Sequence, residues 1–189
     1  VAVATGSRPV EPLVDEAQAV ARLVGSGELL AKTALAKFGR GVPADWRTAL
    51  VDLTEPLSLL PADAPVRVEL LAAAAALLAF SGETAATEQL LHAAEDTHRA
   101  IGSAYSEVVL LATRAIIAPT QRAARAVEDA ERAVELALGT GDPRLVVVAI
   151  HAVLKVGWAS AALDAVASTL DALEEHSRRA GIVFGRVRV

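Results

Sequence analysis

Four histidines are the side chains of this sequence best suited to acid–base chemistry or to metal binding: His92, His98, His151 and His176. None of them lies three or four residues from another histidine, so no helix would present two imidazoles on one face to a metal ion. His151 stands inside the apolar stretch LVVVAIHAVLKV. We interpret it as a histidine satisfied in a core or groove rather than as a metal ligand or a base.

Carboxylates gather at three places along the chain, at 95–96, 128–131 and 174–175. Arginines follow them at i,i+4 spacing, as Arg132 follows Glu128 and Arg179 follows Glu175. Pairs at this spacing are typical of a solvated helix face and contribute about 0.2–0.5 kcal/mol each. We prefer this interpretation to paired acid–base catalysis.

The sequence contains neither an activated nucleophile nor a phosphate-binding loop. Ser106 and Ser160 have neither a neighbouring base nor a glycine-rich elbow in the sequence. The segment 4–7, ATGS, lacks the second glycine and the lysine that cradle phosphates. The sequence therefore predicts no enzyme, no metal site and no cofactor in this chain.

Composition indicates which elements must position any binding residues. Hydrophobic residues make up 53% of the 189 positions but aromatic residues only 3%, and alanine, leucine and valine dominate. Alanine and leucine favour helices, whereas sheets need β-branched and aromatic residues together. The most apolar run, 66–80, contains Arg67 and Glu69 and is shorter than the roughly 20 residues of a membrane span. An all-α fold without a membrane span is expected.

Charge and the cysteine count exclude further classes of site. The net charge of −5 argues against a nucleic-acid surface. The absence of cysteine excludes disulfides and thiolate metal sites. The chain also has no methionine, which we interpret as the mark of an interior segment of a longer gene product.

Glycine, proline and capping residues predict about nine helices after an irregular lead-in over 1–12. Asp45, Asp63 and Asp142 are the expected N-caps, and Glu55-Pro56 is expected to kink or divide the third helix. The expected ranges are 13–24, 28–38, 46–60, 65–80, 84–101, 104–118, 120–138, 143–158 and 161–180.

Three glycines close helices at even intervals, Gly102, Gly141 and Gly181. They mark three helix pairs, about 62–102, 103–141 and 142–181, whose first helix is apolar and whose second is amphipathic. This alternation predicts a TPR-like α-solenoid of antiparallel helix pairs. The helices of 13–61, with their kinked connector, would precede it, and 182–189 would begin a truncated next element. A closed helical bundle is the alternative.

The first helices of such pairs line the concave surface of a solenoid, so polar or aromatic residues on them are candidates for a ligand or partner groove. Arg114, in the middle of LLATRAIIA, needs a carboxylate partner or a groove. The alternative for the whole set is that these side chains extend to water at the helix edge. The candidates are Tyr105, Glu107, Arg114, His151, Lys155 and Trp158.

Two stretches resemble a known family. The segment 130–145, AERAVELALGTGDPRL, and Leu59-Leu60-Pro61 with Arg67 are similar to units of the TPR-like helical region of actinobacterial STAND-type ATPase regulators of the LuxR and SARP kind. The resemblance covers about 29–181. The ATPase motifs and the C-terminal helix-turn-helix of that family are absent from this sequence. The resemblance implies a cytoplasmic sensor arm that receives an effector or a partner protein and relays it to modules elsewhere.

The leading hypothesis is thus a TPR-like sensor and protein-interaction domain of a bacterial transcriptional regulator. Its expected partners are the other domains of its parent protein, a small-molecule effector or protein partner, and a second copy of the chain; nucleic acid and membrane are not expected. One alternative is an oligomerisation or scaffold module without a small ligand. A second alternative is a fragment of a helical enzyme.

Overall fold

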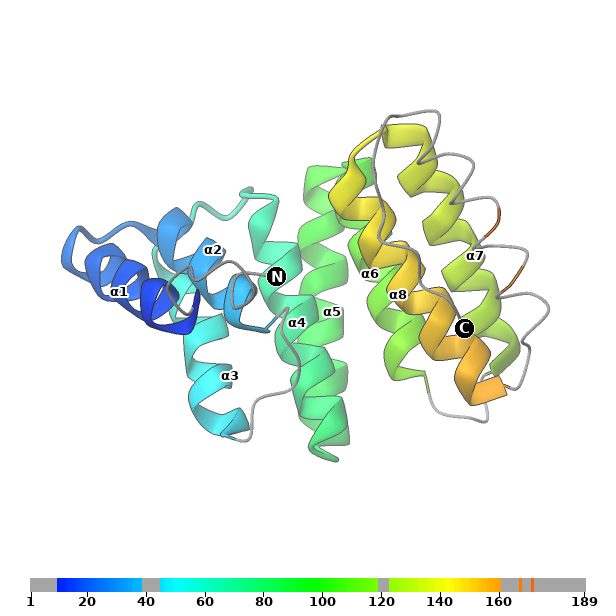
Figure 1. The fold of residues 1–189 in the computed structure, drawn as a ribbon, viewed down its shortest axis with the longest axis horizontal. Coiled ribbons are helices and arrows are strands. Elements are labelled where there is room, and N and C mark those ends of the chain that lie inside the picture. The colour runs from blue at the N-terminus through cyan, green and yellow to red at the C-terminus, as the bar shows by residue number, and fades with distance from the viewer. Residues whose placement is uncertain (1–9, 39–44, 119–122, 161–166, 168–170, 172–189) are drawn as a thin grey trace. The chain divides into compact units, whose positions relative to one another are not determined.

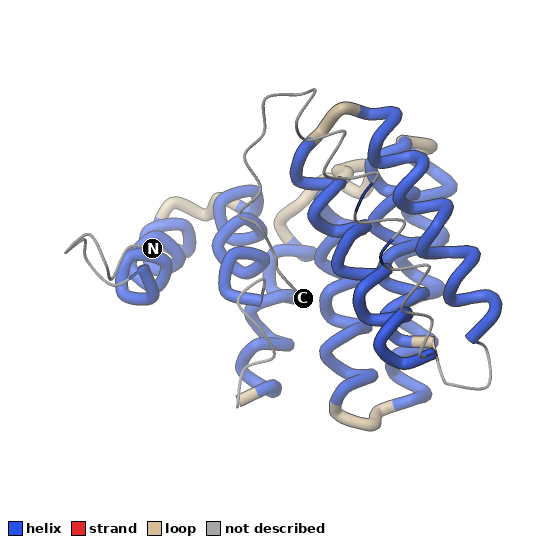
Figure 2. Tube along the Cα trace, turned by 45° about the vertical axis from the view of Figure 1, so that its right-hand side comes forward, coloured by secondary structure: helices blue, strands red, loops and turns tan. Residues whose placement is uncertain are grey.

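A computed structural model describes residues 10–38, 45–118, 123–160, 167 and 171 of the chain. Every regular element in these ranges is helical, which confirms the all-α prediction (Figure 2). The chain divides into two compact units, unit 1 (Val1–Ile101) and unit 2 (Gly102–Val189). The described residues hold eight α-helices, and of the ninth predicted helix, over 161–180, only residues 167 and 171 are among them.

Unit 1 contains the helices that build the site described below (Figure 1). The elements are α1 (Val10–Leu23), α2 (Gly27–Phe38), α3 (Trp46–Thr54), the 3-10 helix η2 (Glu55–Ser58), α4 (Val66–Phe80) and α5 (Thr84–Ile101). Asp45 caps α3 as predicted, because its side chain accepts a hydrogen bond from the Thr48 amide. Pro56 ends the regular helix there, so the predicted interruption at Glu55-Pro56 is confirmed.

Helix α4 forms the core of unit 1. Each residue from Leu70 to Leu78 is buried, so this helix is enclosed on all sides rather than amphipathic. Its Leu70 and Leu77 pack with Ala31 and Ala34 of α2 and with Leu53 of α3. Short alanine side chains allow the neighbouring helices to approach closely, and α5 packs along α4 as its antiparallel partner.

Two details of the helix ends differ from the predictions. Helix α1 begins at Val10 and contains Pro12 in its first turn, where the missing proline N–H has no helical acceptor to lose. Part of the expected irregular lead-in is therefore helical. Asp63 was expected to cap α4, but α4 follows Pro65 and has no side-chain cap. The first amides of α4 instead bond to the Ala64 and Pro65 carbonyls.

Unit 2 consists of α6 (Ala104–Ile117), α7 (Ala123–Thr140) and α8 (Pro143–Ser160). Helix α8 packs on both α6 and α7. Asp142 caps α8 as predicted, since its side chain accepts from the Arg144 amide at 2.9 Å. Gly102 and Gly141 have φ values of 66° and 69°, the left-handed conformation that ends a helix most easily with glycine.

None of the helices in the described part of the chain is long and apolar enough to cross a membrane. This agrees with the expectation for the run 66–80, which forms the buried helix α4.

Candidate functional site

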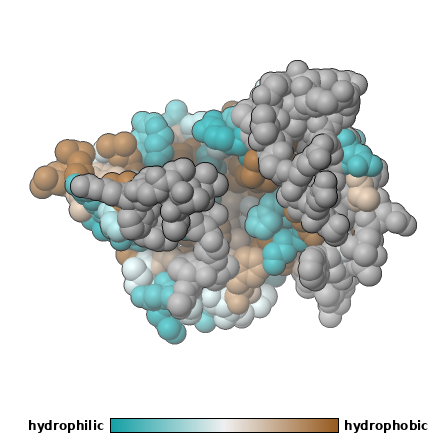
Figure 3. Space-filling model, in the orientation of Figure 1, coloured by the Kyte–Doolittle hydropathy of each residue, from teal (hydrophilic) through white to brown (hydrophobic). Residues whose placement is uncertain are grey.

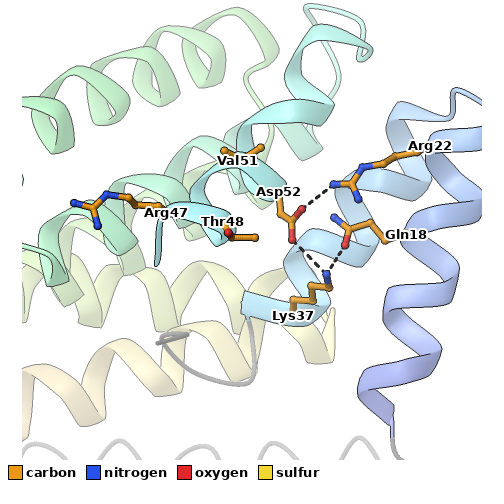
Figure 4. A pocket seen from close by; sticks show the side chains of 7 residues that line it. All are labelled: Gln18, Arg22, Lys37, Arg47, Thr48, Val51 and Asp52. Atoms are coloured by element: carbon orange, nitrogen blue, oxygen red, sulfur yellow. Dashed lines mark hydrogen bonds and ion pairs between the residues drawn. The ribbon is translucent and has the colours of Figure 1, made fainter. Parts of the chain in front are cut away.

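Three helices of unit 1 bring charged and polar side chains together. Helix α1 contributes Gln18 and Arg22, α2 contributes Lys37, and α3 contributes Asp52 (Figure 4). These four residues come from positions 18–52, a stretch for which the sequence predicted no site. We call them the α1–α3 polar cluster.

Asp52 is the centre of the polar cluster. Its carboxylate is only 12% exposed and accepts from Arg22 Nη2 at 2.8 Å and from Lys37 Nζ at 3.3 Å. A carboxylate buried to this degree is stable as an ion only with such partners. Asp52 therefore ties α3 to both α1 and α2.

Lys37 reaches three acceptors with its three ammonium protons. Besides Asp52, Nζ contacts Asp15 Oδ1 at 2.8 Å and donates to Gln18 Oε1. Burial lowers the pKa of Lys37, but the hydrogen bonds and charges of Asp15 and Asp52 outweigh burial and raise the pKa overall. Lys37 is therefore a fixed cation rather than a base.

Arg22 donates most of its hydrogen bonds to Glu55, on the solvent-facing side of the polar cluster. Glu55, at the start of η2, accepts from Arg22 Nε at 3.0 Å and from Nη2 at 2.7 Å. The hydrogen bond to Glu55, joined by that to Asp52, raises the pKa of Arg22 despite some burial. Because Arg22 is 44% and Glu55 32% exposed, this outer pair contributes little to stability.

Gln18 is the unusual member of the polar cluster. Its side chain is 2% exposed, and its amide nitrogen Nε2 has no hydrogen-bond partner among the described residues. A buried amide donor without a partner costs about 1–3 kcal/mol. Figure 4 shows its amide end directed from α1 towards Asp52 on α3.

A cavity of about 430 Å³ lies over the polar cluster. A second cavity of about 230 Å³ shares Lys37, Thr48 and Asp52 with it and extends along α2 and α3. The larger cavity is within the size range of small-molecule sites. Its lining consists of Gln18, Arg22, Lys37, Arg47, Thr48, Val51 and Asp52.

The predicted groove residues Tyr105, Glu107 and Arg114 lie on α6, and Arg114 finds the carboxylate partner that its position required. Its Nη2 lies 3.1 Å from Asp129 Oδ2 on α7, with side-chain exposures of 27% and 14%. Tyr105 and Glu107 are half-buried in the first turn of α6, and the Arg144 guanidinium lies 6.0 Å from the Tyr105 ring.

His151, Lys155 and Trp158 lie on α8, where His151 and Lys155 are exposed and one turn apart. The side chain of Trp158 is outside what the structure describes. Lys155 is eleven residues beyond Arg144, the neighbour of Tyr105, which corresponds to roughly 16 Å along the helix. The six candidates are thus spread along two helices, and their role in a groove stays a prediction.

The sequence contains one indication of the polar cluster, which helical periodicity alone did not identify. Helix α1 has two apolar stripes, one through Leu13 and Val20 that continues to Val24 just after the helix, and one through Val14 and Ala21. Gln18 continues the second stripe, and a polar residue on a buried stripe needs hydrogen-bond partners from neighbouring elements. In the structure the second stripe faces inward, whereas Leu13, Val20 and Val24 are 43%, 50% and 61% exposed.

Within the described ranges, no group of three or more His, Cys, Asp or Glu side chains could hold a metal ion. No family model, curated protein or solved structure matches this chain.

Proposed function

We propose that this chain is an effector-sensing and protein-interaction domain, and that the α1–α3 polar cluster is its ligand site. The observation that carries the proposal is the buried amide of Gln18, whose nitrogen has no partner among the described residues and which lines a cavity between helices. Proteins rarely retain such a group without a function, because replacing it with an apolar side chain removes its cost.

The position of the cavity suggests how binding would be transmitted. The side chains that line it come from three helices, and Asp52 of α3 forms ion pairs with both α1 and α2. A ligand that contacts these side chains would favour one arrangement of the three helices over others. Its differential affinity would then shift the population of the whole domain.

The helix pairing of unit 2 and the sequence resemblance support a more specific proposal. In unit 2, α8 packs on both α6 and α7, as the first helix of a following pair does in a TPR-like stack. We propose that the chain is a TPR-like sensor arm of a cytoplasmic bacterial transcriptional regulator. The arm would relay effector binding to ATPase and DNA-binding modules outside this chain.

A thermal-shift screen with a panel of metabolites and nucleotides tests the sensor function. A ligand that binds only the folded state raises the melting temperature by mass action, and the stabilisation grows with the logarithm of the ratio of ligand concentration to Kd. A hit that protects α1–α3 in hydrogen exchange would support the proposal. A flat panel, together with a defined oligomer in light scattering, would favour the scaffold alternative.

The scaffold alternative has one observation of its own. Apolar side chains are exposed along the outer face of α1, where Figure 3 shows hydrophobic surface at the left of the view. Leu23 is 87% exposed and Val24 61%. Such a face is suited to a helix of another chain or of another copy, and the light-scattering measurement tests it directly.

A further inference from the structure

We infer that the cavity over the α1–α3 polar cluster binds a small oxyanion, a carboxylate or a phosphate, whose oxygen accepts hydrogen bonds from Gln18 Nε2. This inference rests on the proposed sensor function and specifies the chemistry of its ligand. Three features carry it: the orientation of the Gln18 amide, the surplus of hydrogen-bond donors, and the charge of the lining.

Lys37 fixes the orientation of the Gln18 amide. An ammonium group only donates hydrogen bonds, so the amide group must present its oxygen to Lys37 Nζ. The NH2 group then faces away from Lys37. Rotating the amide by half a turn would exchange its oxygen and nitrogen. The hydrogen bond from Lys37 would then be lost, so the rotation cannot give Nε2 a partner without removing another contact.

The polar cluster has more donors than acceptors. Lys37 has committed its three protons to Gln18, Asp15 and Asp52. Arg22 uses Nε and Nη2, and its Nη1 makes no hydrogen bond to any described residue. The unused N–H groups belong to Gln18 and Arg22, so a complementary ligand must bring acceptor atoms.

Arg47 is the lining cation that favours an anionic acceptor over a neutral one. Arg22, Lys37 and Arg47 line the cavity as cations and Asp52 as an anion, and Glu55 and Asp15 pair with Arg22 and Lys37 beside the lining. The guanidinium of Arg47 lies over the Trp46 ring, 4.5 Å from its centre, and points away from Asp52 in Figure 4. It makes no ion pair with a described residue and can turn towards an anion.

Access to Gln18 requires a side chain to move, because Gln18 itself is 2% exposed. Arg22 is 44% exposed, and it can exchange Glu55 for an anion at little cost while its Nη2 stays on Asp52. Glu55 then competes with the bound anion for the guanidinium of Arg22. Removing the charge of Glu55 should strengthen the binding of an anion, whereas it would weaken a merely structural cluster.

The experiment uses Trp46 as its reporter. The chain has two tryptophans, so Trp158→Phe leaves Trp46, which the Arg47 guanidinium covers, as the single fluorophore. This protein is titrated with sodium succinate and with sodium phosphate, at an ionic strength held constant with sodium chloride. The two anions separate a carboxylate from a phosphate source, and the neutral diamide of succinate is the matched uncharged probe.

The expected result is a saturable change in Trp46 emission with at least one of the two anions. Gln18→Leu should weaken that response by roughly tenfold or more, because each tenfold corresponds to about 1.4 kcal/mol of the lost hydrogen bond. Glu55→Gln should strengthen it by roughly two- to fivefold. Gln89→Leu, which removes an exposed glutamine of α5, is the control and should leave the response unchanged.

Other outcomes overturn the inference and are distinguishable from failure of the proposed function. Saturable binding of the neutral diamide without that of either anion would exclude an oxyanion site while leaving a ligand site in place. A hit from the metabolite panel that is insensitive to Gln18→Leu would do the same. If neither the anions, the diamide nor the panel gives a response, both the oxyanion site and the sensor function fail.

Discussion

Arg114 of α6 and Asp129 of α7 form an ion pair across the helix hairpin of unit 2, with Nη2 and Oδ2 3.1 Å apart. The pair explains how an arginine can stand in the last turn of an apolar helix, since a partly buried guanidinium needs a carboxylate near it. It also gives unit 2 a specific polar contact between two otherwise apolar faces.

Removing Arg114 should destabilise unit 2. Arg114→Ala leaves Asp129, whose side chain is 14% exposed, without its cation, and we expect a loss of about 1–2 kcal/mol in the free energy of unfolding. Urea denaturation measures it. The control is Arg132→Ala, which breaks the exposed pair with Glu135 and should cost less than about 0.5 kcal/mol. Equal losses in the two variants would show that burial of the pair is unimportant.

Two glycines in helices should respond to alanine with opposite signs. A Cβ on Gly27 would lie 2.9 Å from Leu59 Cβ and 3.0 Å from the Leu59 carbonyl carbon. Gly27→Ala must therefore push α2 away from the segment after η2, and we expect a destabilisation of about 1–3 kcal/mol. Gly139→Ala meets no atom within 4 Å and should stabilise by about 0.5–1 kcal/mol, because alanine favours the helix. Thermal unfolding of both variants checks the prediction, and a stabilising Gly27→Ala would contradict the close contact with Leu59.

Gln18 should be dispensable for stability although it is buried. Gln18→Leu removes an amide nitrogen without a partner among the described residues and leaves Lys37 with Asp15 and Asp52. We expect a gain of about 1 kcal/mol in the free energy of unfolding, measured by urea denaturation without ligand. A loss of more than about 2 kcal/mol would mean that the amide contributes to the fold. In that case the presence of Gln18 in the folded core would need no ligand.

Asp142 should make the stability of unit 2 sensitive to acid. Hydrogen bonds from the Arg144 side chain and amide lower the pKa of Asp142 below its ordinary value of 3.8. A group whose pKa is lower in the folded state stabilises the fold above the pKa of the unfolded state, and this contribution is lost as the pH falls through the folded value. Asp142→Asn keeps a cap for α8 but does not titrate.

The measurement is the unfolding free energy from pH 7 to pH 3. Below about pH 4 the wild-type protein should lose stability more steeply than Asp142→Asn. Asp63→Asn is the matched control, because Asp63 is exposed and does not cap α4. Identical slopes for wild type and Asp142→Asn would contradict the prediction.

Much of the fold could be predicted from the sequence because capping and helix-breaking residues stand at the helix ends. Pro56, Asp45 and Gly102 act through backbone geometry and local hydrogen bonds, which need no knowledge of the tertiary structure. The prediction for Asp63 was wrong because α4 begins at Val66, directly after Pro65, and its first amides bond to backbone carbonyls instead. Where two local sequence signals favour different helix starts, tertiary packing determines which one the structure uses.

The site was harder to predict because it depends on which stripe of α1 faces inward. Leu13 and Val14 begin two stripes of similar hydrophobicity, and the sequence alone does not distinguish them. Only the packing of α1 on α2 shows that Val14, Gln18 and Ala21 share the inner face. Lys37 and Asp52 join Gln18 in the polar cluster from 19 and 34 residues further along the chain, a separation that periodicity within one helix cannot bridge.

Helix α4 and helix α1 should differ widely in amide hydrogen exchange. An enclosed helix such as α4 exposes its amides only when the surrounding helices separate, so its exchange rates report the opening of unit 1 as a whole. Helix α1 buries only Gln18 and Ala21 among its described side chains, so its amides can exchange through a local opening. The two helices thus record two separate free energies within one unit. A ligand at Gln18 that slowed exchange in α1 alone would be acting on the local opening, and one that slowed both would be acting on the unit.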